Sequence, residues 1–217
     1  MPEAQTQRRT AVQLFAVSFT ALFLELMLIR WVPAVVPVVA YYTNLMLMSS
    51  FLGLGLGALL TSRKLNLFAW FPALLLADML LFWTCREFLI SSSDSEYHFF
   101  SKSPGLVNYV LLITVFVLNA SVFVPLGERI GQLFSSLPVL RAYSWDLGGS
   151  LTGTLAFGFF SLLAFSPLAG LSAVALVYVS LQTSTRSRIG SAVLMVLAVG
   201  LVWQTTNRQA HWSPYQY

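Results

Sequence analysis

Residues 41–64 of the chain read YYTNLMLMSSFLGLGLGALLTSRK and decide the fold. Residues 45–60 carry no charge, and Asn44 is the one side-chain amide of the stretch. A helix needs about 20 predominantly apolar residues to cross the hydrocarbon core of a bilayer. The stretch therefore predicts a transmembrane helix, and Arg63 and Lys64 directly after it place this end in the cytoplasm.

The glycines of this stretch predict close helix packing. Gly53 and Gly57 form a small-xxx-small pair, which allows the backbone of another helix to approach closely. Gly149 and Gly153 form a second pair with the same spacing. We predict that all four are packing residues and that the two pairs face each other across one interface.

The composition extends the membrane assignment to the whole chain. Its 217 residues are 57% hydrophobic and 9% charged, and the mean hydropathy is +0.76, whereas a soluble domain has about 25% charged residues. The net charge of +4 comes from bases scattered as ones and twos at the ends of apolar runs, which excludes a nucleic-acid-binding stripe. We expect an all-α, polytopic helical membrane protein with about seven transmembrane helices in one bundle.

The apolar runs divide the chain into three parts: a cytoplasmic N-terminal tail (1–10), a transmembrane helical domain (11–204) and a C-terminal tail (205–217). The predicted spans are residues 11–29, 41–60, 67–84, 106–126, 143–165, 167–182 and 189–203. The proline-containing segment 31–40 is expected to be an interfacial or re-entrant connection. Segment 127–141 has apolar residues at helical spacing between charged ends, which predicts an amphipathic helix on the membrane surface.

The basic residues orient the seven spans. Eight of the twelve fall on the side of the N-terminus, namely Arg8, Arg9, Arg63, Lys64, Arg129, Arg141, Arg186 and Arg188. The positive-inside tendency places that side in the cytoplasm, and we expect an integral protein of a bacterial cytoplasmic (inner) membrane. The C-terminal tail then lies outside; merging the fifth and sixth helices, or adding segment 31–40 as a span, would reverse it.

Polar and ionisable residues within the spans or at their boundaries form a candidate polar intramembrane site: Glu25, Arg30, Asn44, Asp78 and Asp146. A charged group at the centre of a bilayer costs at least ~2.5 to 3.5 kcal/mol, so it is paired, hydrated or functional. The functional interpretation is a polar pocket that accepts a cation or relays a proton. The structural interpretation, which we favour, is that Glu25 pairs with Arg30 or with a donor of another chain, Asp146 caps the fifth helix and Asp78 is hydrogen-bonded and neutral.

No cofactor, metal or catalytic residue is predicted. His98 and His211 have no companions at metal-ligand spacing. Cys85 is the single cysteine, which excludes a disulfide within the chain and a multi-cysteine metal site. The GLGLG run lies inside an apolar span, without the strand and turn that a phosphate-binding loop requires.

Several stretches together resemble the membrane-anchored spermidine-synthase-like proteins. They are FLELMLIRW (23–31), NLMLMSSFLGLGLGALL (44–60), VPLGERIGQLF (124–134), AYSWDLGGSLTG (142–153) and WSPYQY (212–217). In that family a multi-helix domain precedes an aminopropyltransferase-type domain, and a Ser-Pro-Tyr segment leads into the soluble part. The family's nucleotide-binding loop and acidic catalytic residues have no counterpart here, so no catalytic position is transferred.

The resemblance implies that the chain corresponds to the membrane half alone and has no catalytic activity of its own. Its expected partners are the lipid bilayer and either a separately encoded aminopropyltransferase-like domain or a second copy of the chain. The competing hypothesis is a small transporter or carrier for a cation or polyamine, with Glu25, Asp78 and Asn44 as its polar pathway. An enzyme acting within the bilayer is disfavoured, because no nucleophile and base pair is visible.

The orientation is testable with reporter fusions. Fusions after Lys64, Arg141 and Arg188 should report the cytoplasm, and fusions within residues 91–103 should report the outside, because short basic loops stay inside. A cytoplasmic signal from residues 91–103 would contradict the seven-span arrangement.

Overall fold

A computed structural model describes residues 2–42, 44–63, 66–91, 106–163, 166–182 and 184–206. Within these residues every regular element is helical, which confirms the all-α prediction. The α-helices are α1 (Pro2–Val35), α2 (Pro37–Ala40), α3 (Leu45–Leu60), α4 (Phe71–Ser91), α6 (Leu106–Ser135), α7 (Val139–Leu162), α8 (Pro167–Leu181) and α9 (Thr185–Thr206). Two short 3-10 turns, η1 (Thr61–Arg63) and η2 (Leu67–Trp70), connect α3 to α4.

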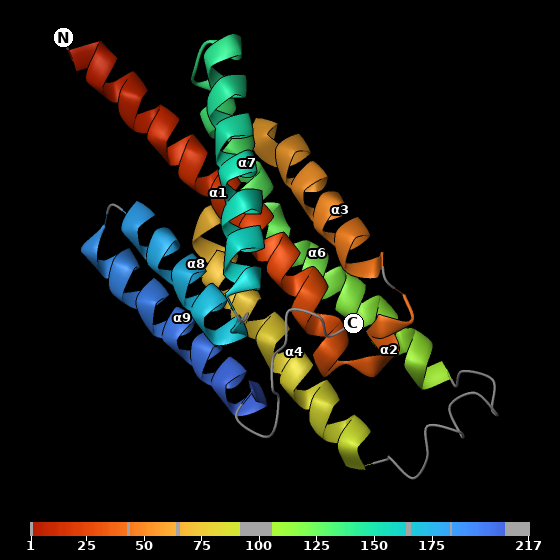
Figure 1. Cartoon of the computed structure of the whole chain (residues 1–217). Coiled ribbons are helices and arrows are strands. Elements are labelled where there is room, and N and C mark those ends of the chain that lie inside the picture. Colours follow the sequence, from red (N-terminus) through yellow and green to blue (C-terminus); the bar gives the residue numbers. More distant parts are fainter. Residues whose placement is uncertain are drawn as a thin grey trace.

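The long helices run up and down around α1 (Figure 1). α1 contacts α3, α4, α6, α7 and α8, while α9 packs against α4 and α8 at one side of the bundle. The predicted N-terminal tail is helical from Pro2, so α1 is one long helix. It ends just after Pro33, and the buried connection through α2 leads into α3.

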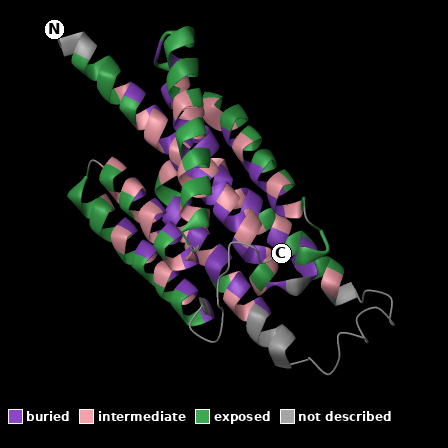
Figure 2. Cartoon of the chain, in the orientation of Figure 1, coloured by how far each residue is buried: buried purple, intermediate pink, exposed green. Residues whose placement is uncertain are grey.

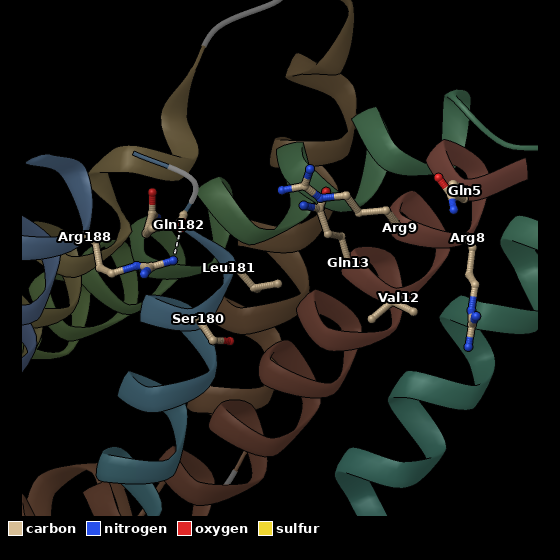
Figure 3. A pocket seen from close by; sticks show the side chains of 9 residues that line it. All are labelled: Gln5, Arg8, Arg9, Val12, Gln13, Ser180, Leu181, Gln182 and Arg188. Atoms are coloured by element: carbon tan, nitrogen blue, oxygen red, sulfur yellow. Dashed lines mark hydrogen bonds between the residues drawn. The ribbon is translucent and has the colours of Figure 1, made fainter. Parts of the chain in front are cut away.

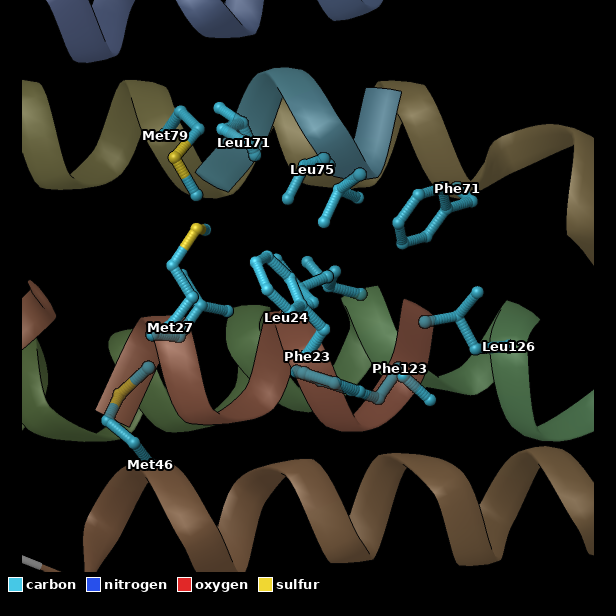
Figure 4. Packing of buried hydrophobic residues seen from close by; sticks show 14 of the residues in the cluster. Phe23, Leu24, Met27, Met46, Phe71, Leu75, Met79, Phe123, Leu126 and Leu171 are labelled. Carbon is cyan, nitrogen blue, oxygen red and sulfur yellow. The ribbon is translucent and has the colours of Figure 1, made fainter. Parts of the chain in front are cut away.

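The core lies where α1 meets its neighbours. Leu24 and Met27 of α1 face Leu75 and Met79 of α4 (Figure 4), and these side chains are at most 1% exposed. Figure 2 shows the buried residues gathered around α1, with exposed residues along the outer faces of α3, α7 and α9. Many of these outer residues are large and apolar, such as Leu59 at 75% exposure, which suits a surface that faces lipid.

Among the described residues, five helices are long and apolar enough to cross a membrane, rather than the seven predicted: Gln5–Val35, Leu45–Arg63, Leu67–Cys85, Asn108–Ser135 and Thr185–Thr205. α8 is apolar but has 15 residues, which is short for the hydrocarbon thickness. α7 has 24 residues, but glycines, hydroxyl side chains and Asp146 interrupt its apolar sequence. The chain is thus a helical membrane protein in which α7 and α8 complete the bundle.

The prediction of a separate surface helix at 127–141 was wrong. α6 continues through Pro125 to Ser135, so the GERIG sequence is the last part of a 30-residue helix. Gly127 lies against the backbone of Leu54, and Gly131 lies against the hydroxyl of Thr61. The two glycines form a small-xxx-small pair that faces α3, and this packing holds the segment in the bundle.

The four predicted packing glycines all face another helix. A methyl group added at Gly53 or Gly57 would overlap the carbonyl oxygens of Ala120 and Val124 in α6. We call this interface the α3–α6 seam. A methyl group added at Gly149 would overlap the carbonyl oxygen of Phe15 in α1 in the same way, and Gly153 faces that of Phe19.

The predicted partner of each pair was nevertheless wrong. Gly53 and Gly57 do not meet Gly149 and Gly153; the second pair forms its own interface, the α1–α7 seam. A small-xxx-small pair fits any helix backbone that comes close, so the partner does not have to be another glycine pair.

A matched pair of substitutions in α3 tests the seam. Gly57→Ala should destabilise the fold by about 1–3 kcal/mol, since its methyl group overlaps α6 backbone. Gly55 is exposed with open space around it, so Gly55→Ala should be neutral or should stabilise α3 by up to about 1 kcal/mol. Unfolding of the purified variants in detergent measures both effects, and equal stability of the two would contradict the seam.

Candidate functional site

Two of the predicted acids lie in the core without hydrogen-bond partners. Glu25 of α1 is 1% exposed and Asp78 of α4 is 0% exposed. Among the described residues, neither oxygen of either carboxyl group has a hydrogen-bond partner. The predicted hydrogen bonding of Asp78 and the predicted pairing of Glu25 with Arg30 are therefore not present as hydrogen bonds.

A third polar side chain, which sequence analysis did not single out, lies buried between α6 and α3. The amide nitrogen of Asn119 donates to the Ser49 hydroxyl, with longer contacts to the Ser50 hydroxyl and the Met46 carbonyl oxygen. Both serine hydroxyls donate to the Met46 carbonyl oxygen. All of these donors are used within the α3–α6 interface, while the Oδ1 atom of Asn119 has no partner among the described residues.

Glu25 and Asp78 lie at nearly the same depth in the bundle. α1 and α4 run in the same direction (Figure 1), and the rings of Trp31 and Phe82 meet with centroids 5.9 Å apart. Glu25 lies six residues before Trp31 and Asp78 lies four residues before Phe82. At 1.5 Å of rise per residue, their depths differ by about 3 Å.

Asn119 lies at this depth as well. α6 runs opposite to α1, and Arg129 of α6 donates to the Gln13 side chain of α1. Glu25 lies twelve residues after Gln13 and Asn119 lies ten residues before Arg129, a difference of about 3 Å in depth. We call Glu25, Asp78 and Asn119 the acceptor layer, because their free atoms are all oxygens.

The other predicted site residues lie elsewhere. Asn44 is exposed at the start of α3, away from the core. Arg30 is partly buried, five residues beyond Glu25 on α1. Asp146 does not cap its helix, because α7 begins at Val139; its carboxylate accepts a hydrogen bond from the Ser18 hydroxyl of α1 and joins the two helices.

A fourth acid, Glu128 of α6, shows how this fold satisfies a structural carboxylate. Glu128 is 0% exposed. Its Oε2 atom accepts from the backbone N–H of Leu67 at 2.8 Å, and its Oε1 atom accepts from the Gln132 side chain at 2.9 Å. This role was not predicted because GERIG was expected on the membrane surface, although the spacing of Gly127 and Gly131 predicts packing.

The hydrogen bonds of Glu128 belong to a polar cluster that connects α1, α6, α8 and η2. Arg129 donates to Gln13 of α1 and Gln132 of α6, and its guanidinium lies 5.7 Å from the centroid of the Phe68 ring in η2. The Tyr178 hydroxyl of α8 donates to the Phe68 carbonyl oxygen at 2.7 Å. This cluster lies near the end of the bundle where α1 starts, well above the acceptor layer.

The acceptor layer presents oxygens without matching donors in an apolar core. A buried carboxylate without a partner is costly unless a proton or another cation compensates it. No group of three or more His, Cys, Asp or Glu side chains in the described residues is placed to hold a metal ion. The layer is therefore suited to a proton or to a ligand that brings N–H donors.

Comparisons with known proteins assign no relative: no family model, no curated protein and no solved structure matches the chain. The resemblance to spermidine-synthase-like proteins thus stays a prediction.

The contrast between the two buried glutamates is testable with one isosteric change. Glu128→Gln turns one of its two accepting oxygens into an NH2 group that meets a donor, so it should cost about 1–3 kcal/mol of unfolding free energy. Glu25→Gln removes no hydrogen bond among the described residues and exchanges one buried polar group for another, so it should cost less than Glu128→Gln. Unfolding in detergent compares them, and a larger loss for Glu25→Gln would show that Glu25 has a partner.

Proposed function

We propose that this chain is an integral membrane protein that binds a proton or a small organic cation at the acceptor layer and carries it across the bilayer. The observation behind the proposal is that Glu25 and Asp78 are buried, lie at one depth and have no hydrogen-bond partner among the described residues. Ionisable groups within membrane spans are functional by default when nothing pairs them.

The buried Glu128 and the half-buried Asp146 support this assignment by contrast. Glu128 has an accepted hydrogen bond on each oxygen, and Asp146 accepts from Ser18. The fold therefore supplies donors where an acid serves packing. Among the described residues Glu25 and Asp78 have none, which supports the functional interpretation over the structural one.

The chemistry of the layer favours an ammonium group as the organic cation. An ammonium group has three N–H donors and one positive charge, and the layer has four carboxyl oxygens and one amide oxygen without donors. A polyamine is a ligand of this class. A proton needs less room and satisfies a carboxyl group equally well, so both belong in the test.

The membrane module of a spermidine-synthase-like protein in a bacterial cytoplasmic membrane is the second candidate. Three of the stretches that carry the resemblance contribute to the two helix-packing seams, which supports this candidate. Residues 44–60 and 124–134 form the α3–α6 seam, and residues 142–153 lie in the α1–α7 seam. Such a module would act with a separately encoded aminopropyltransferase-like domain or with a second copy. An adjacent reading frame for that domain would support this candidate, and co-purification of the two products would test it.

Transport assays on the full chain in phosphatidylcholine vesicles test the first candidate. The wild-type protein should take up protons, reported by an internal pH dye, or labelled spermidine, above the level of protein-free vesicles. Glu25→Gln and Asp78→Asn should each reduce this uptake at least tenfold, since each removes the charge that a cation needs, with the amount of folded protein unchanged.

Asp146→Asn is the matched control, because Asp146 is an acid of the same bundle that already has a partner in Ser18. It should retain uptake near the wild-type level. Wild-type uptake in both Glu25→Gln and Asp78→Asn, or no uptake by the wild-type protein, would refute the carrier function.

A further inference from the structure

A cleft of about 510 Å³ opens between the start of α1 and the ends of α8 and α9 that meet there. Figure 3 shows Arg9 extending from α1 toward α8 and Arg188 extending from α9 on the opposite side of the gap. Arg8, Gln13, Leu181 and Gln182 also line it. The volume lies within the range of about 300–1,000 Å³ that small-ligand sites occupy.

Among the described residues that line it, the cleft has three cationic side chains and no acid. Among the described residues, Arg8 and Arg9 have no ion-pair partner. One terminal nitrogen of Arg188 donates to the Gln182 carbonyl oxygen at 2.8 Å, which fixes that side chain at the rim and leaves its other N–H groups available. Planar guanidinium groups with free donors match the oxygens of a phosphate group.

The position of the cleft favours a lipid headgroup over a soluble phosphate as the ligand. It lies at the end of the bundle that holds the exposed bases Arg63, Arg141 and Arg186, where the apolar spans begin. Val12 and Leu181 continue its lining toward the apolar part of the bundle. A lipid molecule places its phosphate at this level and its chains alongside the helices, and basic pockets between helices on the cytoplasmic side bind anionic headgroups.

We propose that the cleft between α1 and the α8–α9 connection binds the phosphodiester headgroup of an anionic phospholipid through Arg9 and Arg188. This site is separate from the acceptor layer, so the proposal of lipid binding does not depend on the proposed carrier function.

The test measures the dissociation constant of fluorescent phosphatidylglycerol for the full chain in phosphatidylcholine nanodiscs. Arg9→Gln and Arg188→Gln should each weaken binding about fivefold, the effect of one basic residue near a membrane surface. Arg9→Lys keeps the charge but loses the planar fork, so its affinity should fall between those of Arg9→Gln and the wild type.

Arg63→Gln is the matched control: it removes one exposed charge from the same end of the bundle, outside the cleft. Its binding should change less than twofold. An equal loss in Arg63→Gln would show general surface attraction and overturn the site, as would wild-type affinity in both cleft variants. Inorganic phosphate, added at constant ionic strength, should not displace the lipid; displacement would assign the cleft to a soluble anion instead.

Discussion

Close approach of helix backbones is the constraint on which the rest of this structure depends. In a bilayer, burying an apolar side chain between helices gains little, because lipid chains are equally apolar. Association then depends on packing, and packing depends on how near two backbones come. The α3–α6 and α1–α7 seams bring glycine backbone directly against carbonyl groups of the facing helix. The two seams hold α3 against α6 and α7 against α1.

The buried and half-buried acids form two groups, those with a hydrogen-bond donor beside them and those without one among the described residues. Where two elements need to be joined, as at Glu128 and Asp146, a donor is present and the carboxylate acts as a link. At the depth of Glu25 and Asp78 the neighbouring residues are apolar and the Asn119 donors are already occupied. The core therefore has spare acceptors where it is furthest from either end of the bundle. A fold that only needed stability would have apolar residues at these two positions.

The sequence predicted which residues pack or are buried as acids better than it predicted which residues they contact. Gly53 and Gly57 were predictable as packing residues because glycine spaced by four in an apolar run has few other uses. Their partner was not predictable, since the facing surface in α6 is mostly backbone, and backbone carbonyls leave no pattern in a sequence. Glu25 and Asp78 stood out as acids within spans, but their common depth depends on the directions and offsets of α1 and α4. Glu128 went unnoticed because it follows the predicted end of its span, where an acid is ordinary, and Asn119 because a single neutral amide within a span stands out less than an acid.

The position of α7 in the chain has a consequence for biosynthesis. α1 leaves the ribosome well before α7, its glycine-rich partner, and the hydrogen bond from Ser18 to Asp146 joins residues 128 positions apart. Until α7 is synthesised, α7 does not cover the face of α1 that will contact it, and α1 carries an acid within its span. α7 is itself too polar to be one of the five apolar spans, so it enters the bilayer against a helix that is already there. The α1–α7 seam thus forms only after α3, α4 and α6 have been made, and α8 and α9 join the bundle after it.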